Sequence, residues 1–202
     1  MRGFFSLDGT FYKFGSILAD IFMVSFLWLV FSIPIITIGA STSAAYYVFT
    51  KRVDGKDSYI IKGFISSFVK NLKQNIIITI ILFAISYVLW LNFQLLDYSN
   101  LGNLTFVVQL GLTFVSFQLI LMTMYIFPII ARFESTIKDA MKTSLKIANK
   151  HLFFTISNFI MLLAIIILIE LVPFLIIFII GIYIYLSSFG FVRLFKKYNE
   201  KF

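Results

Sequence analysis

The chain has 202 residues, of which 60% are hydrophobic and only 13% are charged, and its formal net charge is +8. Soluble domains are about half apolar and about a quarter charged. The composition therefore excludes a water-soluble globular protein, because too few ionisable groups are present to cover its surface. The absence of cysteine excludes disulfides, thiolate nucleophiles and cysteine metal sites. The basic excess does not indicate nucleic-acid binding, because Lys and Arg lie in short strips beside apolar runs, where they fix membrane topology.

Five apolar stretches are long enough for a helix to cross the hydrocarbon core of a bilayer, which takes about 20 residues. They are residues 17–38, 76–96, 104–131, 152–169 and 171–192. In lipid, a single segment can satisfy all of its backbone hydrogen bonds only as a helix, and the other solution is a closed β-barrel. The sequence therefore predicts an all-α, polytopic transmembrane helix bundle of about five spans, forming a single integral membrane domain over 1–202.

The first stretch, 17–38, is too long for the apolar core of a secretory signal, so we expect an uncleaved helix. If it crosses the membrane once, as we expect, residues 1–16 face outside. The alternative is a re-entrant hairpin broken at Pro34, which keeps the N-terminus inside. Asp20 lies early in this stretch, and an intramembrane carboxylate is a functional candidate by default. It either reaches the interface or pairs with a basic or hydroxyl group on another helix.

The end of the first stretch carries an unusual run of small residues. Pro34 frees a backbone carbonyl, and Gly39 permits a sharp change of direction. Small residues four positions apart, such as Gly39 and Ser43, let another helix approach closely. We therefore predict a packing or partner-binding corner, and a bend that lines a ligand site is the alternative. Its residues are Pro34, Thr37, Gly39, Ala40, Ser43 and Ala44.

Two basic segments, 51–75 and 132–150, have the three- and four-residue apolar spacing of amphipathic helices. The apolar faces are formed by Ile61, Phe64, Ile65, Phe68 and Leu72 in the first segment, and by Ile137, Met141, Leu145 and Ala148 in the second. Lys138, Lys142, Lys146 and Lys150 repeat every four residues and make one basic stripe. We expect an interfacial helix that lies on anionic headgroups. A docking surface for a cytoplasmic protein is the alternative.

The distribution of charge orients the predicted spans. Fifteen of the 17 basic residues lie in 51–75, in 132–150 or in the tail after residue 192. The positive-inside rule places these segments, and with them the C-terminus, in the cytoplasm of a bacterial cell. Glu170 and Pro173 then mark an outer turn between the last two spans, and Trp90 and Tyr98 fall at the outer interface. Because the third stretch is long and contains Pro128, we expect it to tilt or to break there.

No set of residues with catalytic spacing is evident in the sequence. His151 is the only histidine and lies beside Lys150 at the start of a span, where an interfacial polar residue is the ordinary interpretation. Nucleophile–base pairs, glycine-rich phosphate loops and metal-ligand spacings cannot be assembled. We therefore expect no enzymatic activity, no cofactor and no metal site.

Several short motifs resemble the YesL family of bacterial integral membrane proteins, a domain of unknown function numbered 624. The segments that carry the resemblance are Phe5–Gly9, Ala19-Asp20, Leu27–Leu29, Pro34–Ser41, Ala44–Tyr47, Phe64–Phe68, Asn71–Asn75 and Pro128–Phe133. The resemblance covers essentially the whole chain and is densest before residue 80.

The resemblance implies a role but no mechanism. Members of the family are often encoded beside carbohydrate importers of the ABC type, which implies an accessory or regulatory subunit in sugar uptake. The expected partners are the anionic bilayer surface and either importer subunits or further copies of the chain, with no nucleic acid. The alternative is a small oligomeric transporter or channel in its own right.

Overall fold

The computed structural model of the chain describes residues 10–56, 59–98, 103–172 and 176–198. Within these residues the protein is all-α, which confirms the predicted fold class. The elements are α1 (Thr10–Phe31), the 3₁₀ turn η1 (Ile35–Thr37), α2 (Ile38–Val53), α3 (Ile60–Tyr98), α4 (Asn103–Arg132), α5 (Ile137–Lys150), α6 (Leu152–Leu171) and α7 (Ile176–Lys196). Five of these helices (α1, α3, α4, α6 and α7) are long and apolar enough to cross a membrane.

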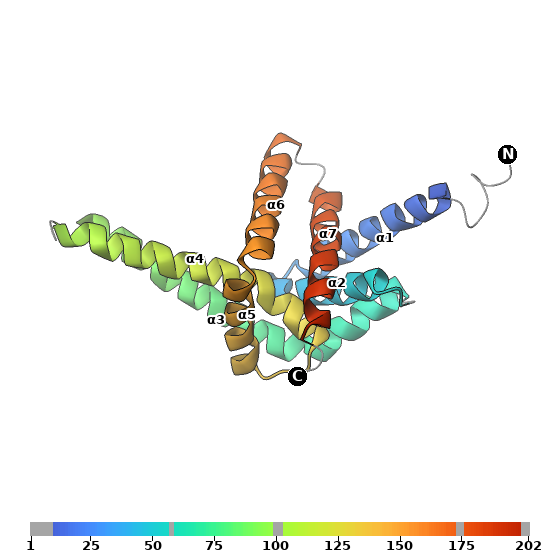
Figure 1. Cartoon of the computed structure of the whole chain (residues 1–202), viewed down its shortest axis with the longest axis horizontal. Helices are drawn as coiled ribbons and strands as arrows, with labels where there is room; N and C mark the ends of the chain where they lie inside the picture. Colours follow the sequence, from blue (N-terminus) through green and yellow to red (C-terminus); the bar gives the residue numbers. More distant parts are fainter. Residues whose placement is uncertain (1–9, 57–58, 99–102, 173–175, 199–202) are drawn as a thin grey trace.

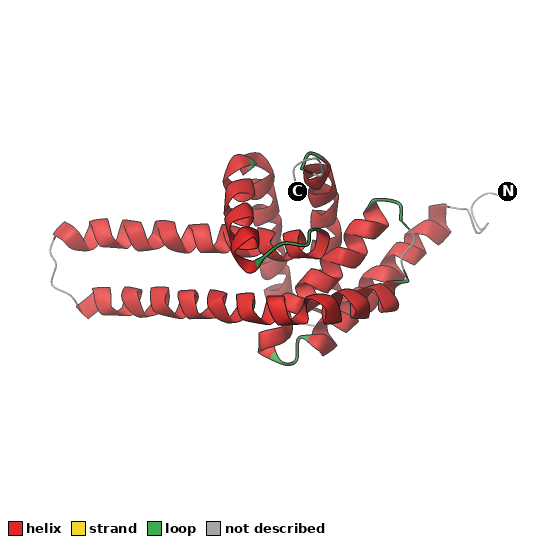
Figure 2. Ribbon diagram, turned by 90° about the horizontal axis from the view of Figure 1, so that it is seen from below, coloured by secondary structure: helices red, strands yellow, loops and turns green. Residues whose placement is uncertain are grey.

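The membrane-spanning helices leave a common centre as three arms. Figure 1 shows α3 and α4 extending together to the left, α6 and α7 pointing upward, and α1 leaving to the right. Figure 2 shows from a second side that α3 and α4 run next to each other along the left arm. The helices pack against one another mainly where the arms meet. Their outer lengths present apolar side chains to the surroundings, as expected of surfaces that face lipid or another membrane helix.

The short helix α2 lies at the centre and contacts α1, α3, α4 and α7. It is buried along most of its length because small side chains let its neighbours approach, whereas Tyr46 and Phe49 fill the wider gaps. Next to it, the fully buried ring of Phe191 in α7 packs edge-on against Tyr46 and Tyr125 at centroid distances of 5.5 and 5.3 Å. These aromatic contacts join α2, α4 and α7 into one core.

The predicted first span differs from the structure, because the helix ends at Phe31 and the chain turns before α2 begins. Arg52, near the end of α2, lies 2.9 Å from both Ser16 and Asp20 of α1, while Trp28 donates a hydrogen bond to Thr42 at the other end. The two helices therefore run antiparallel. An antiparallel pair of this kind is what the hairpin alternative requires, because α1 then begins on the side from which the basic segment continues.

Two further predicted boundaries also differ. The segment 59–75 and the span 76–96 form one continuous helix, α3, whose 39 residues reach about 58 Å. That is nearly twice the thickness of a hydrocarbon core. The helix is therefore long enough for its basic first half to lie outside the hydrocarbon core. In α4, the helix continues through Pro128 to Arg132, so of the predicted tilt or break the break does not occur.

The remaining elements lie close to their predicted ranges. Within the predicted segment 132–150, α5 begins at Ile137, because Thr136 caps it by accepting a hydrogen bond from the Asp139 backbone. Glu170 is exposed in the last turn of α6, and Trp90 is exposed and stacks on Tyr87. Pro173, residues 1–9 and the side chain of Tyr98 lie outside the described residues.

The hairpin of α1 and α2 makes a prediction about topology. A cysteine introduced at Gly15, an open position, should react with a membrane-impermeant maleimide from the same side as a cysteine at Lys56. The reason is that the Ser16 and Arg52 side chains hydrogen-bond at one end of the hairpin. The chain has no cysteine of its own, so labelling of intact and permeabilised cells gives a clean readout. Reaction from opposite sides would instead support a single crossing.

Candidate functional site

The predicted corner divides into an exposed turn and a buried helix face. Pro34 is exposed, and the Thr37 hydroxyl donates to the carbonyls of Phe31 and Pro34 at 2.6 and 2.7 Å. The turn thereby satisfies backbone groups that the proline leaves without helical partners. The other four residues, Gly39, Ala40, Ser43 and Ala44, are buried within α2.

At Gly39, near the start of α2, side chains of α3 and α4 approach the α2 backbone closely. A Cβ atom on Gly39 would lie 2.3 Å from the Thr79 hydroxyl and 2.5 Å from the Phe127 ring. Side chains fill this face of α2, as in helix packing on small residues. The adjacent face is different, since Ile38, Thr42 and Tyr46 line a cavity of about 340 Å³.

The cavity lies between α2, α3, α4, α6 and α7, and most of its lining is apolar. Buried hydroxyl pairs lie close to it. Tyr46 is 3.0 Å from Ser187, and Tyr125 is 2.6 Å from Thr155. These pairs join α2 to α7 and α4 to α6, so they fix the helices around the cavity. Hydrogen bonds of this kind stabilise helix contacts in membranes by about 1 kcal/mol.

The predicted intramembrane carboxylate, Asp20, lies against a cation. Its side chain is 17% exposed and is 2.9 Å from the Arg52 guanidinium, which also donates to Ser16. An ion pair lowers the free-energy penalty of a carboxylate beside the hydrocarbon region. The geometry gives Asp20 a role in joining α1 to α2, because Arg52 contacts two successive turns of α1.

A second carboxylate, Asp54, organises a cluster that sequence reasoning missed. Its oxygens lie 3.0 Å from the ammonium of Lys196, 3.5 Å from that of Lys56 and 3.6 Å from the guanidinium of Arg132. We call these four residues the Asp54 cluster. Asp54 is the only one of the four with a strongly buried side chain, which is 9% exposed. The cluster therefore connects the C-terminal ends of α2, α4 and α7.

Backbone geometry places Asp54 at this junction. Gly55 has a φ of 72°, and the Lys56 N–H donates to the Lys51 carbonyl, which is how a left-handed glycine closes a helix. The chain can then turn from α2 towards α3. The sequence does contain a signal, because Asp54 lies between Arg52 and Lys56 and directly precedes a helix-ending glycine.

The Asp54 cluster makes a prediction about stability and pH. A hydrogen bond from Lys196 and the charges of Lys196, Arg132 and Lys56, partly opposed by burial, lower the pKa of Asp54 below its ordinary value of 3.8. The ionised carboxylate therefore stabilises the fold above pH 3.8, and this contribution is lost as the pH falls through the lower folded-state pKa. Asp54→Asn should lower the free energy of unfolding by about 1 kcal/mol at pH 7. The loss is small because Lys56 and Lys196 are hydrated again once they lose their partner.

Thermal unfolding in mild detergent tests this expectation. Glu134→Gln is the control, since it changes the charge equally but removes only an exposed pair with Lys70. The difference between wild type and Asp54→Asn should shrink below pH 3.8. Equal effects of the two substitutions at pH 7 would contradict a special role for the cluster.

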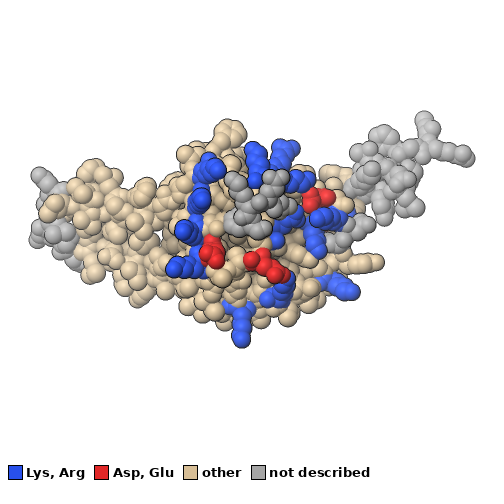
Figure 3. Space-filling model, turned by 60° about the horizontal axis from the view of Figure 1, so that its bottom comes forward, with Lys and Arg blue, Asp and Glu red and all other residues tan. Residues whose placement is uncertain are grey.

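The predicted basic stripe is exposed on α5. Lys138, Lys142, Lys146 and Lys150 are all exposed, whereas Ala140, Ser144, Ile147 and Ala148 are buried against the rest of the protein. Figure 3 shows Lys and Arg side chains gathered over the centre of the molecule, whereas the apolar arm at the left carries none on this face. The centre of the molecule thus has a strongly basic face, and the apolar helices extend away from it.

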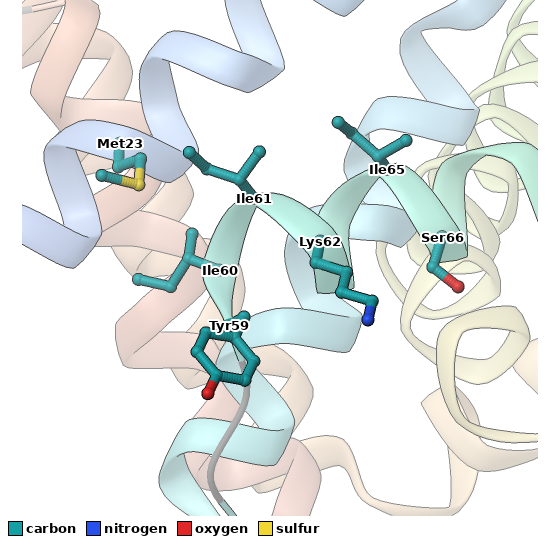
Figure 4. Close-up of a pocket in the computed structure, with 7 residues that line it drawn as sticks. All are labelled: Met23, Tyr59, Ile60, Ile61, Lys62, Ile65 and Ser66. Atoms are coloured by element: carbon teal, nitrogen blue, oxygen red, sulfur yellow. The ribbon is translucent and has the colours of Figure 1, made fainter.

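The exposed surface also has an apolar trough of about 980 Å³ between α1 and the start of α3. In Figure 4, Ile61 and Ile65 extend from the same side of α3, and Met23 lies across from them on α1. Two of the five residues of the predicted apolar stripe in 59–75 thus face this trough, because Ile61 is 49% and Ile65 is 41% exposed. Phe64 and Phe68 are buried against the ring of Phe31, and Leu72 is partly buried against the same core.

No metal site is evident in the described part of the chain, where no three His, Asp or Glu side chains come together. The Nε2 atom of His151 lies 3.0 Å from the Tyr198 hydroxyl, and among the described residues no carboxylate hydrogen-bonds to it. Glu170 and His151 lie at opposite ends of α6, so the structure does not bring the two together.

These features define a class of protein: an all-α polytopic membrane protein with a buried central helix and a basic face. A comparison with protein families gives the more particular assignment. Residues 21–93 match the family described as "Protein of unknown function, DUF624", which confirms the resemblance from α1 into α3. The family-like segments Phe5–Gly9, Ala19-Asp20 and Pro128–Phe133 lie outside the match. No curated protein and no solved structure shows a significant similarity to the chain.

Proposed function

We propose that this protein is a non-enzymatic accessory or regulatory subunit of a membrane transporter. The observation that carries the proposal is the openness of its membrane-spanning helices. Only 11% of the α6 span and 17% of the α3 span are buried within the chain. Transmembrane helices associate through close packing of their faces, and these spans leave most of their faces available to another protein.

The basic face and the trough support the same function. Ile61, Lys62 and Ile65 all line the trough and lie at the start of α3, which is the basic half of that helix. An apolar surface next to a positive one suits a partner segment that is amphipathic and acidic. The link to carbohydrate importers of the ABC type comes from the family resemblance alone, and the bacterial cytoplasmic membrane with a cytoplasmic C-terminus follows from the positive-inside rule.

Purification in mild detergent tests this proposal. The tagged full-length protein should retain importer subunits in a fixed stoichiometry, identified by mass spectrometry. Ile61→Ser combined with Ile65→Ser should reduce this recovery, whereas Val69→Ser, at a more exposed position of α3 that does not line the trough, should not. Recovery of the protein without importer subunits would contradict the proposal.

The alternative function is a small oligomeric transporter or channel. The observation that favours it is the cavity of about 340 Å³ between five helices, with the hydroxyls of Thr42, Tyr46 and Tyr183 in its lining. Copies of the chain could close their open faces against one another and continue this cavity into a path. Solute uptake by proteoliposomes that contain this protein alone would support the alternative, and the accessory role predicts none.

A further inference from the structure

We propose that a small basic pocket between α6 and α7 binds the phosphate group of an anionic membrane lipid. The pocket has a volume of about 230 Å³ and is lined by His151, Phe154, Gly190, Arg193, Leu194 and Lys197. It is separate from the Asp54 cluster, from the trough and from the cavity beside α2, none of which shares a lining residue with it.

The charge of the pocket is suited to an anion. Arg193 and Lys197 are four residues apart near the end of α7, so their side chains extend from the same face. No acidic residue is among those that line the pocket in the described part of the chain. An arginine and a lysine together provide a planar fork and a point charge, both of which bind phosphate.

The third polar group of the pocket is His151. Its Nε2 atom lies 3.0 Å from the Tyr198 hydroxyl, and the Lys150 ammonium lies 5.7 Å from the centre of the Tyr198 ring. Burial and the nearby charges of Lys197 and Lys150 lower the pKa of His151. A neutral imidazole still carries one N–H, which it can donate to a phosphate oxygen or to Tyr198. The described surroundings of His151 are thus electropositive, and no carboxylate is among the described residues that line the pocket.

The position of the pocket indicates a lipid as the source of the phosphate. His151 immediately precedes the α6 span, and Lys197 immediately follows the α7 span. The pocket is therefore at the level where the apolar spans end, which is where lipid headgroups lie. A volume of 230 Å³ equals roughly seven or eight water molecules, so a phosphate with part of its glycerol fits.

Exposed apolar side chains lie close to the pocket residues in both membrane-spanning helices. Leu186 is four residues before Gly190, on the same face of α7, and is 48% exposed. Phe153, in the first turn of α6, is 91% exposed. A lipid can thus place its phosphate among the cations and its acyl chains on these residues, whereas inorganic phosphate makes only the first set of contacts. The chemistry of the site matches a ligand that carries both parts.

Lipid binding to the full-length protein in neutral detergent tests the proposal. Phosphatidylglycerol is titrated into the micelles, and the bound lipid is counted by native mass spectrometry, with phosphatidylcholine and inorganic phosphate in parallel. We expect saturable binding of phosphatidylglycerol. Arg193→Gln combined with Lys197→Gln should weaken it roughly tenfold or more, because each basic residue contributes about as much as a surface lysine near anionic lipid.

The control is Lys138→Gln combined with Lys142→Gln, which removes the same charge from the basic stripe of α5 and should weaken binding far less, because neither lysine lines the pocket. Lys197→Gln alone, at an exposed position, provides a second variant that does not disturb packing and should weaken binding by a smaller factor. Equal losses in the two double variants would overturn the proposal in favour of general surface charge. Inorganic phosphate that binds as tightly as phosphatidylglycerol would overturn the assignment to lipid.

Discussion

Replacing Phe191 by alanine is expected to lower the free energy of unfolding by about 3 kcal/mol. Its ring has no exposed surface and packs against four other rings, those of Tyr46, Tyr125, Phe154 and Phe195, with centroids 5.2 to 5.5 Å away. Alanine would leave a cavity where α2, α4, α6 and α7 meet. The estimate is at the low end for Phe→Ala, because an apolar side chain gains little free energy when it moves from lipid into the core of a membrane protein.

Thermal unfolding in detergent measures this effect, and Phe189→Ala is the matched control. Phe189 is two residues earlier in the same helix, is 41% exposed and packs against one ring, that of Tyr185. Its replacement should change the midpoint by far less than that of Phe191. Midpoints that fall equally for both variants would show that Phe191 is not the centre of the core.

The second large effect is expected from Gly181→Ala, which should separate α1 from α7. A Cβ atom at this position would lie 2.7 Å from the Ile21 backbone oxygen and 2.2 Å from the Ser25 hydroxyl. The Gly181 N–H also donates a hydrogen bond to Ser25 at 3.0 Å. A backbone atom cannot rotate out of the way, so α1 has to shift as a whole. We expect a loss of about 2 kcal/mol, the usual effect of overpacking.

Gly111→Ala is the control for this substitution. Gly111 lies within α4, and nothing lies within 4 Å of a Cβ atom built on it. Because alanine favours a helix over glycine by about 1 kcal/mol, Gly111→Ala should be neutral or stabilising. A disulfide between cysteines introduced on facing positions of α1 and α7 should also form less readily in Gly181→Ala. Equal stability of the two glycine variants would contradict close packing of α1 on α7.

The number and approximate position of the membrane-spanning helices could be predicted from the sequence. Apolar length alone sets them, because any segment of about 20 apolar residues needs a helix in lipid. The basic stripe on α5 could also be predicted, since a four-residue repeat places lysines on one face of any helix. The resemblance found at Pro34–Ser41 lies within the residues that match the DUF624 family.

Other features depend on contacts between segments far apart in the chain. Whether residues 17–38 form one helix or a hairpin depends on the pairing of Arg52 with Asp20 and Ser16, which are more than 30 positions away. The break expected at Pro128 does not occur, because the helix around it is buried against α2 and α3, and this packing outweighs the local preference of proline.

The sequence by itself thus determined the environment of this protein, its all-α class and the separation of its basic segments from its apolar spans. These properties follow from composition and period, which are local. The tertiary structure decided the turn between α1 and α2, the position of Asp54 among three cations and the pocket of His151, Arg193 and Lys197. Each of these requires residues from different helices to meet, and no local pattern specifies which helices become neighbours.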